Sequence, residues 1–180
     1  MDTNKLKFTK LQNGIFSFLS ENSGERFSQR EIARKLSVSP TAISKALKLL
    51  EKEKLIKSEK EKGLNRSFIS VNRDNQNAVD LKRVENLKAI YQSGIINFLS
   101  EDFPGCTIIL FGSYSKGEDT KGSDIDLAII GTKNKQTDLT KFEKLMNKEI
   151  NLNFYKTWNI DKHLKNNILN GIVLSGGIEL

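Results

Sequence analysis

The sequence predicts a mixed α+β fold made of two small domains, residues 1–73 and 74–180. In the first part, helical periodicity and helix-start signals dominate, and two short strand-like runs follow them. In the second part, an opening helix is followed by apolar strand-like runs separated by polar loops. Charge separates the same two parts, because residues 1–73 carry 16 Lys and Arg against 8 Asp and Glu, whereas residues 74–180 carry 13 against 14.

Length and composition restrict the classes of protein that fit this chain. With 180 residues and 37% hydrophobic content, it can bury two small cores. No apolar run approaches the roughly 18 residues that a membrane span requires, and the start is polar, so we expect a cytoplasmic protein without a membrane partner. Cys106 is the single cysteine, which excludes an internal disulfide. The basic excess of the first part suggests a polyanionic partner, although a general lysine bias would give the same balance.

The first domain contains three predicted helices. Its first helix is indicated by a periodic set of apolar residues, Leu6, Leu11, Ile15, Phe18 and Leu19. The run Ser28 to Glu31 is a Ser-x-x-Glu capping box, in which each end satisfies a backbone amide of the other, so a second helix begins there. Ser39 caps a third helix with Pro40 at its first position, where a missing N–H costs nothing.

The third helix has an apolar and a polar face. Its apolar stripe consists of Ile43, Leu47 and Leu50, and its polar face of Thr41, Ser44, Lys45 and Lys48. Two strand-like runs, residues 55–58 and 66–71, then flank a charged turn that contains Gly63, which predicts a hairpin.

Three helices, a tight turn between the second and third, and a charged hairpin resemble the winged helix-turn-helix family of bacterial and archaeal regulators, and residues 30–47 carry the likeness. The resemblance implies binding to double-stranded DNA, with the third helix in the major groove. The residues expected at the DNA are Thr41, Ser44, Lys45, Lys48, Lys60, Lys62 and Arg66. A winged helix used only for protein contacts is the alternative, which Glu59 and Glu61 favour because they would repel phosphate. A homodimer that reads two half-sites is also open.

Residues 74–100 are predicted to connect the two parts through one helix over residues 76–100. This helix is indicated by apolar residues spaced three or four positions apart, Val84, Leu87, Tyr91, Ile95 and Phe98. Pro104 ends it, because proline cannot continue a helix. We assign this helix to the second domain, with a dimerising helix as the alternative.

The second domain contains a pattern suited to phosphate and metal chemistry. A buried strand over residues 107–111 runs into Gly112-Ser113, and a second strand opens with Asp124-Ile125-Asp126. Carboxylates at positions i and i+2 of a strand project from the same face and repel each other when ionised. A divalent cation removes that conflict, and Mg²⁺ takes one or two carboxylates together with substrate phosphates. The Gly-Ser turn offers backbone amides and a hydroxyl to such phosphates.

The order Phe111-Gly112-Ser113, ten further residues, then Asp124-Ile125-Asp126-Leu127 resembles the DNA polymerase beta-like nucleotidyltransferase superfamily. The likeness, to its minimal members, implies a mixed sheet flanked by helices. It implies that Gly112 and Ser113 hold a nucleoside triphosphate, with ATP expected, and that Asp124 and Asp126 are catalytic and bind Mg²⁺. Lys116 stands where a phosphate contact is expected. The implied reaction transfers a nucleoside monophosphate to a hydroxyl of a small molecule or of a partner protein such as a HEPN-type toxin.

One departure concerns the third carboxylate that this family carries on a following strand. Here the alternation of the strand after residue 148 places Asn151 or Asn153 at that position, and neither amide can act as a base. Glu149 lies two residues before Asn151 and therefore on the same face of the strand, which makes it the remaining acidic residue that could take the place of the third carboxylate. We therefore expect a DNA-binding protein with a Mg²⁺-dependent nucleotidyltransferase domain. Whether this domain catalyses transfer is a question that the sequence leaves open. The alternative is a weak or inactive nucleotide-sensing regulator or antitoxin-like component.

Overall fold

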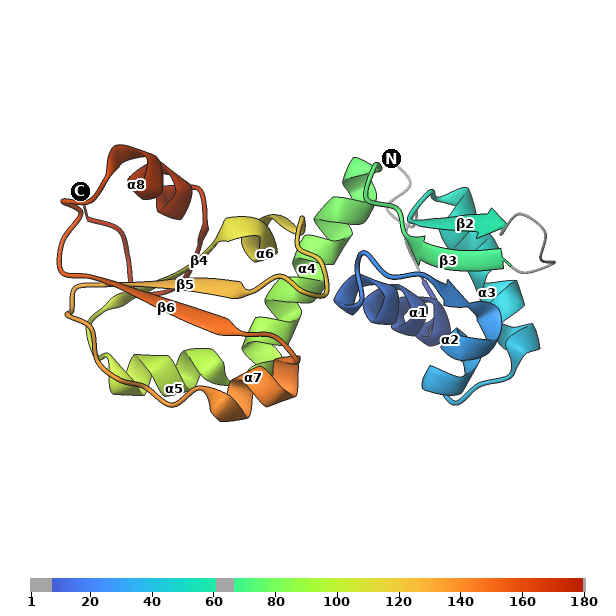
Figure 1. Cartoon of the computed structure of the whole chain (residues 1–180), viewed down its shortest axis with the longest axis horizontal. Coiled ribbons are helices and arrows are strands. Elements are labelled where there is room, and N and C mark those ends of the chain that lie inside the picture. Colours follow the sequence, from blue (N-terminus) through green and yellow to red (C-terminus); the bar gives the residue numbers. More distant parts are fainter. Residues whose placement is uncertain (1–7, 61–66, 180) are drawn as a thin grey trace. The chain divides into compact units, whose positions relative to one another are not determined.

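The computed structural model describes residues 8–60 and 67–179, which form two compact units, Met1–Lys82 and Arg83–Leu180 (Figure 1). The expected domain boundary after residue 73 thus lies nine residues before the division between the units. The helix that follows residue 75 begins in the first unit and ends in the second. It supplies Ala78 to the first core and Ile90 to the second.

The first unit combines three helices with a small antiparallel sheet. Its elements are α1 (Lys10–Glu21), β1 (Phe27–Ser28), α2 (Gln29–Lys35), α3 (Pro40–Lys52), β2 (Ile56–Lys60) and β3 (Ser67–Val71). The strand order is β1-β3-β2, and each of the three helices packs against the sheet. The two-residue strand β1 carries no sequence pattern of its own, because it is defined by pairing with β3. The hairpin turn, with Lys62 and Arg66, lies outside the described residues.

Local capping signals determine where the helices of the first unit begin. The Ser28 hydroxyl accepts a hydrogen bond from the Glu31 amide at 3.3 Å, and the Glu31 carboxylate accepts one from the Ser28 amide at 2.7 Å. The predicted capping box is therefore confirmed. Ser39 caps α3 in the same way through the Ala42 amide, with Pro40 at the first helical position, as predicted.

The single helix predicted over residues 76–100 is wrong, because the structure has α4 (Gln76–Ser93) and α5 (Ile95–Asp102). Gly94 separates them with φ +76°, a left-handed conformation that glycine adopts without a steric cost. Of the apolar residues that suggested this helix, Ile95 and Phe98 pack in the second core, whereas Val84 and Tyr91 are 58% and 53% exposed. The buried face of α4 in the second unit includes Asn86 and Ile90, and a buried asparagine is invisible to a hydrophobic pattern.

The second unit contains a four-stranded mixed sheet in the order β6-β5-β4-β7. Its strands are β4 (Thr107–Phe111), β5 (Ile125–Ile130), β6 (Ile150–Tyr155) and β7 (Ile172–Ser175), and its remaining helices are α6 (Gly112–Lys116), α7 (Thr140–Met146) and α8 (Lys162–Leu169). The β5–β6 pair is parallel, and the β4–β5 and β4–β7 pairs are antiparallel. The expected α+β fold with a mixed sheet flanked by helices is confirmed.

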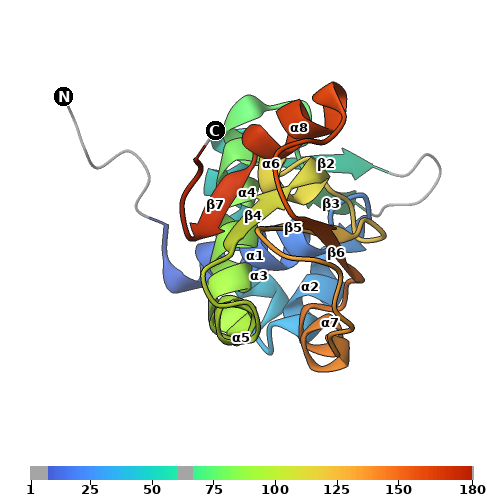
Figure 2. The same ribbon diagram turned by 90° about the vertical axis from the view of Figure 1, so that its left-hand side faces the viewer.

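Both faces of this sheet are covered, which explains why every residue of β4 is buried. One face packs Ile108 and Leu127 against α5 and α7. The other face packs Ile109 and Ala128 against Ile168 of α8. Figure 2 shows α8 on one side of the sheet, with α5 and α7 on the other. Among the residues that the structure describes, no helix combines the length and apolar character needed to cross a membrane.

Candidate functional site

The turn from β4 into α6 brings Gly112 directly against Asp126 of β5. The antiparallel register pairs Phe111 with Asp126, so the residue after Phe111 lies beside that carboxylate. Gly112 has φ +73°, and a Cβ atom placed on it would lie 2.5 Å from Asp126 Oδ2. A side chain at this position would push the Asp126 carboxylate aside, and the left-handed backbone favours glycine, so glycine suits both the backbone conformation and the approach of the carboxylate.

The two aspartates form one cluster with an amide from the neighbouring strand. Asp124 lies just before β5 and is exposed, whereas Asp126 is half-buried within it. The parallel register places Asn151 of β6 beside Asp126. Its Nδ2 donates to Asp124 Oδ2 at 3.3 Å and to Asp126 Oδ1 at 3.4 Å. The two carboxylates therefore converge on the same nitrogen, as expected for residues that share one face of a strand.

The register also decides between the two amides that the sequence left open. Asn151 contacts both aspartates, whereas Asn153 pairs with Ala128 and donates to the Asn151 carbonyl at 3.5 Å. Glu149 precedes β6 and is exposed. In residues 8–60 and 67–179, no three His, Cys, Asp or Glu side chains converge in a way that could hold a metal ion. The position beside the aspartate pair is thus occupied by a neutral amide.

The other two predicted nucleotide contacts lie on the short helix α6. Ser113 is half-buried next to Gly112, and Lys116 is exposed in the last turn. The turn is fixed by the buried Ser115 hydroxyl, which donates to the Gly112 carbonyl at 2.8 Å. The helix ends at Gly117 in a left-handed conformation. These two features fix the first and last turns of α6 beside Gly112.

In the first unit, four of the residues predicted to meet DNA lie on α3, away from its core face. Its core face consists of Ile43, Ala46, Leu47 and Leu50, all buried. Thr41, Lys45 and Lys48 are exposed, and Ser44 is half-buried. Lys60 is exposed at the end of β2. Glu59, which would repel phosphate, forms an ion pair with Arg26 at 3.4 Å.

Two family models match the chain. A model of the HTH domain matches residues 12–64, and a model of the nucleotidyltransferase domain matches residues 93–174. The chain joins an HTH domain to a nucleotidyltransferase domain. The Gly112 turn and the cluster of Asp124, Asp126 and Asn151 all lie within the matched nucleotidyltransferase range.

Several solved structures are similar to the chain. They include ZitR of Lactococcus lactis in complex with DNA, at 26% identity and a TM-score of 0.42 over 57% of this chain and 67% of that one. AdcR of Streptococcus pyogenes is 20% identical, with a TM-score of 0.44 over 57% and 71% of the two chains. The chain covers just under two thirds, 66%, of the length of another similar structure, a single mutant of Lactococcus lactis ZitR. These TM-scores are below 0.5, so the domain assignment depends on the family models. No curated protein matches the chain.

Within the nucleotidyltransferase domain, sequence reasoning missed a buried lysine that holds the loop between the two motifs. Lys148 Nζ donates to the carbonyls of Thr120 at 2.7 Å and Ser123 at 2.9 Å, and lies 3.5 Å from Asp119 Oδ2. The Lys148 and Asp119 side chains are only 7% and 2% exposed. Lysine and aspartate are almost never fully buried unless they are paired. The pair therefore anchors the loop over residues 119–123, which directly precedes Asp124.

Asn86 of α4 completes this buried network. Its Nδ2 donates to Asp119 Oδ1 at 2.6 Å and to the Tyr114 carbonyl at 2.9 Å. Asn86, Asp119 and Lys148 come from three separate segments of the sequence, and each looks like an ordinary surface residue there. No spacing rule could have found them, since only the fold brings them together.

The donor set of the cluster fits a divalent cation with two protein carboxylates. Asp124 and Asp126 direct one oxygen each to a shared position, and the Asn151 side chain also carries an oxygen. Mg²⁺ is usually held by one or two carboxylates, with waters and substrate phosphates completing its shell. Asp124 and Asp126 are therefore the residues that would hold such an ion.

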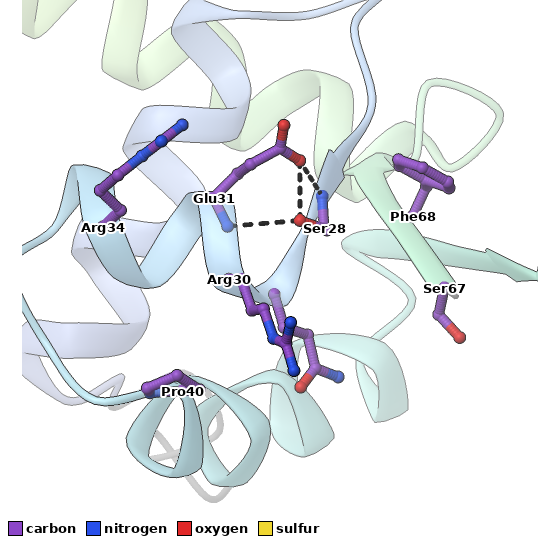
Figure 3. Close-up of a pocket in the computed structure, with 8 residues that line it drawn as sticks. Ser28, Arg30, Glu31, Arg34, Pro40, Ser67 and Phe68 are labelled. Atoms are coloured by element: carbon purple, nitrogen blue, oxygen red, sulfur yellow. Dashed lines mark hydrogen bonds between the residues drawn. The ribbon is translucent and has the colours of Figure 1, made fainter. Parts of the chain in front are cut away.

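The HTH domain also contains a cavity of about 870 Å³ beside α2, which reaches Pro40 of α3 and Phe68 of β3 (Figure 3). Arg30 and Arg34 line it, and both are exposed. Glu31 lines it too, but its carboxylate is turned toward Ser28 in the capping box. Sequence analysis gave these arginines no role, although their spacing of four residues places them on one side of α2.

Proposed function

We propose that the chain is a DNA-binding protein whose nucleotidyltransferase domain uses a divalent cation, Mg²⁺, to transfer a nucleoside monophosphate to an acceptor hydroxyl. The observation that carries the proposal is the convergence of Asp124 and Asp126 beside the side-chain-free Gly112. The match of residues 93–174 to the nucleotidyltransferase model supports the same chemistry.

Each residue of the turn has a role in this proposal. Gly112 lets the triphosphate approach the backbone, and the Ser113 hydroxyl donates to a phosphate oxygen. Lys116 adds a positive charge to the exposed end of α6. When bound, the cation neutralises charge between the carboxylates and the phosphates. The oxygen of the acceptor hydroxyl would then bond to the α-phosphorus, its proton would pass to solvent because Asn151 cannot accept it, and the bond to pyrophosphate would break. ATP is the expected donor, and a small molecule or a HEPN-type protein is the expected acceptor.

A second candidate function is nucleotide sensing without turnover, and Asn151 favours it. An amide cannot take the proton of the attacking hydroxyl, and the loss of a general base lowers a rate by about two to four orders of magnitude. In this case the nucleotidyltransferase domain binds nucleotide and cation without turnover, and this binding changes the affinity of the HTH domain for DNA. The protein then acts as a regulator or an antitoxin-like component.

The experiment is a transfer assay with α-labelled ATP and Mg²⁺, using a panel of hydroxyl acceptors. We expect slow label transfer by the full chain and none by Asp124→Ala/Asp126→Ala. Glu101→Ala is the matched control, because Glu101 is an exposed carboxylate on α5, which packs against the other face of the sheet. Nucleotide binding that needs both aspartates, without transfer, supports sensing instead. Absence of both binding and transfer refutes the two candidates together.

For the HTH domain, we propose that α3 enters the major groove with Thr41 and Ser44 near base edges and Lys45 and Lys48 near phosphates. The exposed Arg30 and Arg34 extend this basic surface from α2. Contacts from Lys60, Lys62 and Arg66 in the hairpin stay predictions of the sequence. A homodimer likewise stays a prediction.

A further inference from the structure

The amide of Asn151 is positioned against the same oxygens that a cation would use. One Nδ2 atom donates to both Asp124 Oδ2 and Asp126 Oδ1. A side-chain amide has two N–H donors at one end and a carbonyl oxygen at the other. With the oxygen end toward the aspartates, three oxygens would repel one another, which explains why the nitrogen end faces them.

This geometry makes the amide and a cation competitors for the same carboxylate oxygens. The N–H groups of Asn151 offset part of the repulsion between the two aspartates. A half-turn of the amide would replace the N–H donors with a neutral oxygen ligand. The protein then contributes two negative charges to the cation, whereas an aspartate at residue 151 would contribute a third.

We propose that Asn151 is a neutral clamp that keeps the divalent-cation affinity of the Asp124–Asp126 pair low until a triphosphate supplies the missing negative charge. The inference rests on the proposed function, since it concerns the same pair of aspartates. It assigns Asn151 a positioning role and makes cation binding depend on nucleotide. Ligand charge is a main determinant of affinity in oxygen-based cation sites.

The first test measures Mn²⁺ binding to the full chain, with the metal alone and without nucleotide, through the electron paramagnetic resonance signal of free Mn²⁺. We expect Asn151→Asp to tighten binding by about tenfold or more, because the cation gains a charged ligand and loses a competitor. Asn153→Asp is the matched control, because it adds the same charge two residues further along β6. There it lies beside Ala128, whereas residue 151 lies beside Asp126. We expect it to tighten binding much less than Asn151→Asp does, because its charge attracts the cation only at a distance and does not become a ligand.

The second test uses thermal melting of the same variants. In EDTA, Asn151→Asp should lower Tm because three carboxylates then repel one another. Saturating Mn²⁺ should raise its Tm by more than it raises that of the wild-type chain, because a ligand that binds only the folded state stabilises it more as its affinity rises. Equal behaviour of Asn151→Asp and Asn153→Asp overturns the inference.

A third measurement needs no variant at residue 151. In NMR spectra of the wild-type chain, added Mg²⁺ with ATP should move the side-chain amide signal of Asn151, and Mg²⁺ alone should move it less. An Asn151 signal that responds fully to Mg²⁺ alone refutes the clamp. Failure of the proposed function looks different, because Mn²⁺ binding would then survive Asp124→Ala/Asp126→Ala.

Discussion

Asp126 Oδ2 lies 2.5 Å from the position that a Cβ atom on Gly112 would occupy. The carboxylate of one motif therefore fills the space left by the missing side chain of the other. Ten residues separate Ser113 from Asp124, and the antiparallel pairing of β4 and β5 brings the two motifs into this contact.

Gly112→Ala should damage the site more than the fold. The new methyl group forces Asp126 to turn away, and alanine at φ +73° costs about 1–3 kcal/mol. We expect Mn²⁺ binding in the presence of ATP to be lost in a titration, and the free energy of unfolding in urea to fall by that amount. Gly122→Ala is the control, because a Cβ atom on Gly122 would meet no atom within 4 Å. Equal effects of the two substitutions would contradict the packing argument.

Lys148→Met should destabilise the nucleotidyltransferase domain by about 1–3 kcal/mol, because it removes the donor to the Thr120 and Ser123 carbonyls and a positive charge beside the buried Asp119 carboxylate. Urea unfolding followed by circular dichroism measures the loss. Lys148→Met/Asp119→Asn should recover part of it, since the buried charge is removed as well. Lys144→Met, an exposed position on α7, should change little. A loss below about 1 kcal/mol for Lys148→Met would refute the anchoring role.

Lys45→Ala/Lys48→Ala should weaken binding to duplex DNA without regard to its sequence. Each lysine that neutralises a phosphate contributes about 0.9 to the slope of log affinity against log salt, so the slope should fall by about 2. Fluorescence anisotropy at several salt concentrations measures it. Lys141→Ala/Lys144→Ala removes the same charge from exposed positions on α7. If both pairs change the slope equally, α3 is not the DNA-binding surface.

A surface ion pair predicts a specific pH dependence. The hydrogen bond that Lys135 donates to Asp102 holds the pKa of this carboxyl below its ordinary value of 3.8. Its stabilisation is therefore present above that value and is lost as the pH falls through the lowered pKa. The Tm difference between the wild-type chain and Asp102→Asn should stay constant above about pH 5 and shrink as the pH falls below 3.8. Lys135→Met should abolish this trend, and a constant difference would contradict the assignment.

The sequence predicted the elements of the fold wherever the signals are local. Ser28 with Glu31 and Ser39 with Pro40 begin helices at the expected residues, because capping depends on atoms within one turn. The break at Gly94 also has a local cause, the glycine itself. The prediction of one helix over residues 76–100 missed it because apolar residues recur at helical spacing on both sides of Gly94.

The sequence by itself determined two domains, the starts of α2 and α3, and the Gly112-Ser113 and Asp124-Asp126 motifs, because these depend on residues close together in the chain. Only the tertiary structure decided that Asn151, and not Asn153, faces the aspartates, since the register of the parallel strands β5 and β6 sets that contact. It also decided that Lys148 is buried. A parallel pair joins segments that are distant in sequence, so its register follows from the packing of the whole sheet and from no local pattern.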